Sequence, residues 1–288
     1  MRITHQQATD SVLSNLRRQT EQIRTAQRVA SSGKKISRPS DDPQTMASIL
    51  DARQILSTIE QYQRNIDMAK LHLKALSTTL DAVDDFIERA SGIAAGAGQN
   101  AQLRTTLAND VALVRDQVIQ LANQRLGDDY LFAGHDVDTA PFLDDGSYIG
   151  DQGTFRVRAS QAMEITLQVD GSTVFVDTED IFSILNNLQI ALENGDNGQI
   201  NALAASLDRF KEHLQTVQAE IGGALDHLEV SRNHLNRFSL NIEKNLADTE
   251  LANPAAAIME LQTHNTVYEA ALSAAANLLQ PSLLNFLR

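Results

Sequence analysis

Apolar side chains recur along this chain at alternating steps of three and four residues, a spacing that gathers side chains on one face of a helix. The first long run keeps a single register for about five heptads. Its members are Ile59, Tyr62, Ile66, Ala69, Leu73, Leu76, Leu80, Val83, Ile87, Ala90 and Ala94. Because an α-helix rises about 1.5 Å per residue, this seam predicts a helix about 80 Å long or more.

A second seam of the same kind occupies the later part of the chain and extends over about six heptads. It consists of Ile200, Leu203, Leu207, Phe210, Leu214, Val217, Ile221, Ala224, Leu228, Ser231, Leu235, Phe238 and Ile242. Between the two seams, Leu107, Val111, Val114, Val118 and Leu121 predict a third helix, and residues 181–192 predict a short one.

The apolar period changes between Leu126 and Val176, where alternation typical of strands replaces the helical spacing. Residues 154–158 alternate, and the runs 165–169 and 172–176 flank an Asp-Gly pair at 170–171. Such a pair between two alternating runs predicts a hairpin with a type I′ turn. We therefore expect a small β insert in the middle of the chain.

Each end of the chain carries a helix with one narrow apolar stripe. The N-terminal stripe consists of Val12, Leu16, Gln19, Ile23, Ala26 and Ala30. The C-terminal stripe follows Pro254 and consists of Ile258, Leu261, Asn265, Tyr268, Leu272, Ala275 and Leu279, with Leu283 and Phe286 beyond it. A short helix with a single stripe depends on packing for its stability, so the two terminal helices are predicted to pair.

The predicted fold is therefore mainly α with a small β insert, in which long antiparallel helices form a coiled-coil rod and the terminal helices pair. We expect five segments along the chain: an N-terminal helix (1–40), the first part of the helical rod (41–127), the β-rich insert (128–180), the second part of the rod (181–250) and a C-terminal helix (251–288).

The break between the first two helices, SSGKKISRPSDDP at residues 31–43, is unusually polar and stiff. Pro39 and Pro43 fix their own φ angles, and Asp42 is placed to cap a helix that has Pro43 at its first position. We call residues 31–43 the elbow and expect it to be a stiff spacer between two helices.

Charge is distributed unevenly along the chain, whose net charge is −13. Residues 1–40 hold eight Lys or Arg against two acidic residues, a balance of +6, whereas residues 248–288 carry −3. This asymmetry favours pairing of the two ends. A mitochondrial transit peptide or a lipid-surface helix would also be basic, but neither needs the coiled-coil register of this arm.

The same charge and composition exclude several classes of function. An acidic chain is a poor nucleic-acid binder, because phosphate contacts need a basic surface. No run of about 18 apolar residues predicts membrane insertion, and no segment resembles a cleavable signal peptide. The absence of cysteine excludes disulfides, thiol catalysis and a cysteine zinc site.

No motif combines a nucleophile, a base and an orienting group, so we expect neither enzymatic activity nor a cofactor. We also expect no metal site, although one alternative stays open. An oxygen-rich cluster of the kind that binds a hard cation is formed in sequence by His135, Asp136, Asp138, Asp144 and Asp145. Aspartate is equally common in solvated turns, which is the simpler interpretation.

Four sequence motifs resemble the flagellin family, and within it the branch of hook–filament junction proteins. Residues 32–36 and 38–43, SGKKI and RPSDDP, are similar to the S-G-K-R-(hydrophobic)-N-R-P-S-D-D-P segment of that branch. Residues 130–134, YLFAG, with Pro141-Phe142 after them, are similar to the hairpin that opens the family's insert. The segments NLAD at 245–248 and PSLLNFL at 281–287 complete the resemblance, which departs at Ser37 and at the flagellin-like ending Leu287-Arg288.

The resemblance implies a structural adaptor subunit that joins the flagellar hook to the filament and folds its terminal helices on assembly. It implies an extracellular place in the bacterial flagellum, export by the flagellar type III pathway, an inner coiled coil at the termini and an outer insert. Implied partners are a hook-side junction protein, flagellin and further copies of the chain in a ring. We expect an export chaperone to bind the C-terminal stripe from Ile258 to Phe286, because that apolar surface most needs shielding before assembly.

Two sets of residues are expected to carry the assembly. The interface set comprises Val12, Leu16, Ile23, Ala26, Ala30, Ile258, Leu261, Tyr268, Leu272, Ala275, Leu279, Leu283 and Phe286. The contact loop that sets axial register comprises Lys34, Lys35, Arg38, Pro39, Asp41, Asp42 and Pro43. Two alternatives remain, which are flagellin itself, the filament subunit, and a coiled-coil binding module.

Overall fold

The computed structural model describes residues 2–97, 101–161, 163–167 and 169–279. In chain order the elements are α1 (Arg2–Ser32), α2 (Pro43–Ala95), α3 (Ala101–Ala122), β1 (Arg125–Leu126), β2 (Asp129–Tyr130), β3 (Phe155–Arg158), β4 (Glu164–Leu167), α4 (Gly171–Phe175), α5 (Ile181–Asn194), α6 (Asn197–Glu250) and α7 (Pro254–Leu279). Residues 1–57 with 238–288 form one compact unit, the terminal unit, and residues 58–237 form the central unit. The mainly helical fold with small antiparallel strand pairs confirms the predicted fold class.

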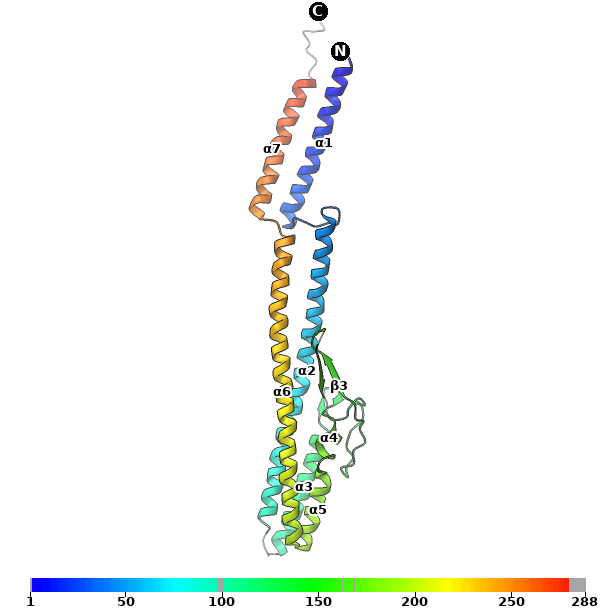
Figure 1. Ribbon diagram of the computed structural model, residues 1–288, viewed down its shortest axis with the longest axis vertical. Helices are drawn as coiled ribbons and strands as arrows, with labels where there is room; N and C mark the ends of the chain where they lie inside the picture. The colour runs from blue at the N-terminus through cyan, green and yellow to red at the C-terminus, as the bar shows by residue number, and fades with distance from the viewer. Residues whose placement is uncertain (1, 98–100, 162, 168, 280–288) are drawn as a thin grey trace, which may run out of the picture. The chain divides into compact units, whose positions relative to one another are not determined.

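The central unit is built on the antiparallel helices α2 and α6 (Figure 1). Side-chain hydrogen bonds between the two helices show that they run antiparallel. Gln63 near one end donates to Asn236, and Gln218 donates to Asp81 further along. Every member of the predicted α2 seam is buried except Tyr62, which is half-buried, and the α6 seam is buried or half-buried from Ile200 to Leu235. Both long seams are therefore confirmed in register within this unit.

Two shorter helices, α3 and α5, pack against one another beside this pair. The predicted stripe of α3 is correct, because Val111, Val114 and Val118 are almost completely buried. Helix α5 is fixed at both ends. At its start, the Asp180 carboxylate accepts hydrogen bonds from the N–H groups of Phe182 and Ser183. At its end, Gly195 adopts the left-handed conformation (φ 69°).

The β insert contains two antiparallel ribbons, β1 with β2 and β3 with β4, with Phe155 opposite Leu167 in the second. The predicted hairpin at Asp170-Gly171 is wrong, since residues 171–175 form the short helix α4 and Asp170 is its N-cap. The Asp170 carboxylate accepts from the Thr173 N–H at 2.9 Å, so the aspartate that suggested a turn instead starts a helix.

An aromatic cluster explains why the chain prefers this helix. The Phe175 ring lies 5.2 Å from that of Phe132 and 5.5 Å from that of Phe142, centre to centre. Gly171 packs so closely that an added Cβ would lie 2.6 Å from the Phe142 ring. The glycine therefore permits close packing and is not needed for a positive φ angle, and burial of Phe175 outweighs the strand pattern.

The terminal unit contains α1, α7 and the adjoining ends of α2 and α6. Helices α1 and α7 lie side by side, as predicted (Figure 1). Helix α6 ends at Glu250 and α7 begins at Pro254, so the break predicted from that proline is confirmed. None of the helices among the described residues combines the length and apolar character that a bilayer crossing requires.

Candidate functional site

The elbow lies against the connection between α6 and α7, two segments more than two hundred positions apart in the chain. The Lys35 N–H donates to the Glu250 carbonyl at 2.8 Å, and the Ala252 N–H donates to the Gly33 carbonyl at 2.9 Å. Gly33 ends α1 in the left-handed conformation (φ 68°), which turns the chain into this pairing. The two helix breaks are therefore joined by main-chain hydrogen bonds.

A buried carboxylate reinforces the junction of the two breaks. Glu250 Oε1 accepts from Lys34 Nζ at 2.5 Å and from an Arg53 guanidinium nitrogen at 2.7 Å. The Glu250 side chain is only 8% exposed. Burial raises the pKa of this carboxyl, but the hydrogen bonds and charges of Lys34 and Arg53 outweigh it, so the pKa lies below its ordinary value. We call these three residues the Glu250 clamp.

A second carboxylate closes the elbow on itself. Asp41 accepts from the backbone N–H groups of Ser37 and Arg38, and its other oxygen lies 3.0 Å from Arg28 of α1. The pKa of Asp41 is lowered, chiefly by the hydrogen bond from the Ser37 N–H, with the Arg28 charge adding to the effect. The stiff geometry of the elbow thus comes from hydrogen bonds as well as from its prolines.

Each break uses the same device to start its next helix. Asp42 accepts from the N–H groups of Gln44 and Thr45, which confirms it as the cap of α2 with Pro43 at the first position. Asn253 accepts from the N–H groups of residues 255 and 256 and caps α7, again with proline at the first position. The Asp-Pro and Asn-Pro pairs in the sequence carried this signal for both helices.

The structure divides the predicted contact loop into two groups. Lys34, Asp41 and Asp42 bond within the chain. The exposed members are Lys35, Arg38, Pro39 and Pro43. The side chains of this second group are exposed and can reach another molecule.

The predicted α1 stripe faces α7. Ala26 is 5% exposed, and Val12, Leu16, Ile23 and Ala30 are half-buried. These positions form the side of α1 that the helix pair covers.

The predicted α7 stripe is only partly correct. Leu261, Tyr268 and Ala275 are buried or half-buried, but Ile258 and Leu272 are 55% and 43% exposed. The other covered positions on α7 are Ala257, His264 and Ala271. The predicted stripe follows steps of three and four residues from Ile258, whereas the covered face is completed by two alanines, whose small side chains let helices approach closely, and a histidine. Leu279 ends α7, and Leu283 and Phe286 lie outside the described residues.

Large apolar side chains remain exposed on the terminal unit. They are Leu13, Leu50, Ile55, Phe238, Leu240, Leu251, Ile258, Met259, Val267 and Leu272, with exposures between 39% and 64%. Phe238, which the sequence assigned to the α6 seam, is among them. Scattered apolar residues are ordinary on protein surfaces, but this many on one slender unit indicates surface that awaits partners.

The oxygen-rich cluster of the insert is a set of turn residues. The Asp145 carboxylate accepts from the Ser147 N–H, and Asp151 accepts from the N–H groups of His135 and Gly153. In the described part of the chain, no three His, Asp or Glu side chains lie close enough together to hold a metal ion. The open alternative of a cation site therefore has no support in the geometry.

Sequence reasoning missed three parts of this site. It did not identify Glu250, Arg53 or Arg28 as partners of the elbow, because Glu250 and Arg53 lie far from each other in the chain and no spacing rule pairs Arg28 with Asp41. The available signals were the Asx-Pro pair at both breaks and the opposite charge of the two ends, to which Lys34 and Glu250 belong.

The chain resembles known flagellar proteins along most of its length. The bacterial flagellin N-terminal helical region matches residues 3–137. The flagellar hook-associated protein 3 of Salmonella typhimurium is 26% identical over 258 residues, which cover 79% of this chain and 81% of that protein.

Solved structures show the same fold. A flagellar hook-associated protein from Vibrio parahaemolyticus aligns with a TM-score of 0.68 and 22% identity, over 73% of this chain and all of that one. FlgL of Bacillus cereus aligns with a TM-score of 0.62 and 20% identity, over 68% of this chain and 99% of that one. With its sequence motifs and its paired terminal helices, the chain resembles the flagellin family, and the relatives it is similar to are hook-associated proteins.

Proposed function

We propose that the chain is a structural adaptor subunit that joins the flagellar hook to the flagellin filament. One observation of the structure carries the proposal. The two ends of the chain form a single unit in which each terminal helix covers only one stripe of the other, and large apolar side chains remain exposed beside it. Such a unit is completed by neighbouring subunits, and the hook-associated relatives indicate which assembly this is.

The partners follow from this role. The adaptor contacts a hook-side junction protein at one end, flagellin at the other and further copies of itself in a ring. The exposed elbow residues Lys35, Arg38 and Pro39 serve the contacts that set axial register, while the Glu250 clamp holds the elbow in shape from within. The subunit is exported by the flagellar type III pathway, and a chaperone shields the α7 stripe before assembly.

Introducing a charged residue at an exposed apolar position of α7 tests the proposal. Leu272→Asp adds a charge at a side chain that is 43% exposed and therefore leaves the α1–α7 pair intact, yet it opposes burial in an assembly. We expect cells with this variant to release flagellin into the medium, as cells without the protein would. Leu272→Met keeps the apolar character and is expected to restore filaments.

Circular dichroism of the purified variants checks that both fold. Normal filaments on cells carrying Leu272→Asp would contradict the proposed role of this surface. The flagellin-like ending Leu287-Arg288 supports the second candidate, the filament subunit itself, which predicts missing filaments without released monomer.

A further inference from the structure

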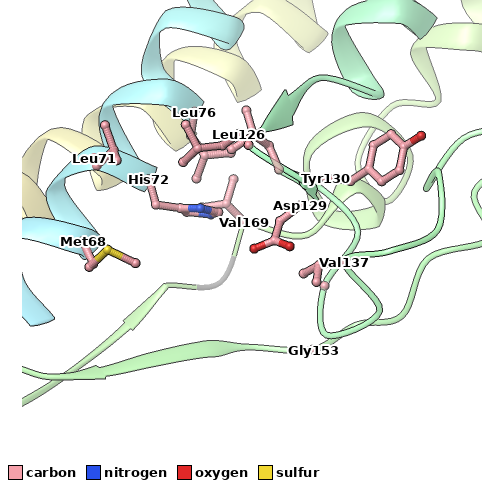
Figure 2. A pocket seen from close by; sticks show the side chains of 13 residues that line it. Met68, Leu71, His72, Leu76, Leu126, Asp129, Tyr130, Val137, Gly153 and Val169 are labelled. Atoms are coloured by element: carbon pink, nitrogen blue, oxygen red, sulfur yellow. The ribbon is translucent and has the colours of Figure 1, made fainter.

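A cavity of about 410 Å³ opens on the central unit between α2 and the segment that follows β1. Figure 2 shows Met68, Leu71 and His72 on the α2 side and Leu126, Asp129 and Val137 on the other. Cavities that bind organic groups in proteins range from about 300 to 1,000 Å³, so this one has room for one large side chain or a small ligand.

The backbone that walls this cavity is held by close packing. Gly134 has a φ angle of 79°, and any side chain there would collide with the backbone of Asp151. Gly153, which also lines the cavity, packs directly against the His135 ring. On the opposite side Leu76 belongs to the core seam and is 1% exposed. The walls of the cavity are therefore fixed by the packing of the unit itself.

Apolar side chains continue from the cavity onto the surface. Met68 is 69% exposed and Leu71 is 55% exposed, although both lie on a helix whose other face is completely packed. An apolar pocket with an apolar rim is the usual form of a protein-docking site, where one inserted side chain supplies most of the binding energy.

The charges around the cavity restrict what can enter. Residues 125–153 contain one basic residue, Arg125, and seven aspartates. Arg125 is engaged, since its guanidinium lies 4.4 Å above the ring centre of Tyr130. Among the described residues that line the cavity, the charged one is Asp129, and none is lysine or arginine.

His72 adds no opposing charge at neutral pH. Burial lowers the pKa of His72, and the charge of Asp129 offsets this only in part. The imidazole is therefore mainly uncharged at pH 7, which leaves the Asp129 carboxylate as the charged group among the described lining residues. An apolar group accompanied by a cation fits both the wall and the rim.

We propose that this cavity docks a segment of a partner protein that inserts an apolar or aromatic side chain beside a lysine or arginine, the cation facing Asp129. The inference does not depend on the proposed adaptor role, because it rests on the walls and charges of the central unit alone.

Methyl resonances of methionine in the full-length chain provide the test. Met68 lines the cavity, while Met46 and Met259 lie in the terminal unit and serve as internal controls. The probes are N-acetyl-phenylalanyl-lysine amide and its glutamate counterpart, which differ only in the charged side chain. We expect a saturable shift of the Met68 methyl by the lysine probe, with a Kd on the order of 1 mM.

The charge is tested separately from the apolar wall. The lysine probe should bind about three to five times more tightly than the glutamate probe, and Asp129→Asn should remove this preference without weakening the glutamate probe. Leu71→Ala, an exposed position, should weaken both probes by a similar factor. Both substitutions lie in the central unit, so an unchanged signal of Met163, which lies in that unit and whose sulfur accepts from Ser231, shows that the variants fold.

Either of two results with the dipeptides would overturn the proposal. Either Met68 shows no saturable shift with either dipeptide, or the two dipeptides bind equally well to the unmodified chain. A third probe, the phenethylammonium ion, separates the possible occupants. If it binds as tightly as the lysine dipeptide, the peptide contributes nothing, and the cavity is a small-molecule site instead of a protein-docking site.

Discussion

Replacing Glu250 by glutamine should loosen the junction between the two helix breaks without changing its shape. The carboxylate is 8% exposed and binds two cations through charged hydrogen bonds. A hydrogen bond to a charged group contributes about 1.5–3 kcal/mol. Lys34 and Arg53 are 41% and 46% exposed and regain water when the charge is removed, so the net loss is closer to 2 kcal/mol than to the sum.

Hydrogen exchange measures this loss where it occurs. The Lys35 and Ala252 amides donate across the junction, and a loss of about 2 kcal/mol predicts roughly thirtyfold faster exchange at these sites in Glu250→Gln. Glu260→Gln is the matched control, because Glu260 lies on the same unit with a side chain that is 67% exposed. Exchange at both amides should be unchanged in that control.

The effect should also depend on pH in one direction. Because the clamp lowers the pKa of Glu250 below its ordinary value of 4.5, its stabilisation is complete above about pH 4.5 and is lost as the pH falls through the lowered value. The difference between the unmodified chain and Glu250→Gln should therefore disappear in acid. Equal exchange rates at pH 7, or a difference that persists at the lowest pH, would refute the reasoning.

Three further predictions concern other elements. Asp42→Ala should increase amide exchange in the first turn of α2, whereas Asp42→Ser should largely preserve protection, because serine also caps helices. Gly171→Ala should destabilise the aromatic cluster by about 1–3 kcal/mol and reduce its near-ultraviolet dichroism, while Gly222→Ala, in open space on α6, should be neutral or stabilising, as thermal melts would show. Limited proteolysis of the monomer should remove about the first 40 and last 35 residues before the central unit is cut, and protected termini would favour the coiled-coil binding module.

The long helices could be predicted from sequence because one period determines both their secondary structure and their packing. The α2 seam from Ile59 to Ala94 is covered as the spacing implied, since it joins the α6 seam in one buried core. The caps at Asp42 and Asp180 are likewise local, and a capping residue acts on the N–H groups that follow it directly.

The errors occurred where distant contacts outweigh local pattern. Residues 172–176 alternate like a strand, but Phe175 gains more by joining Phe132 and Phe142 in one cluster. On α7 two large residues of the predicted stripe, Ile258 and Leu272, are exposed. The Glu250 clamp joins positions that only the tertiary fold brings together, so no spacing rule could reveal it.

Deletion of the gene in the bacterium that encodes this chain tests the adaptor role most directly, with electron microscopy of the cells and assay of the culture fluid for flagellin. The account predicts hooks that lack filaments and flagellin monomers that accumulate in the medium. Filaments of normal length on the deleted strain would contradict it, and missing filaments without released monomer would identify the chain as the filament subunit instead.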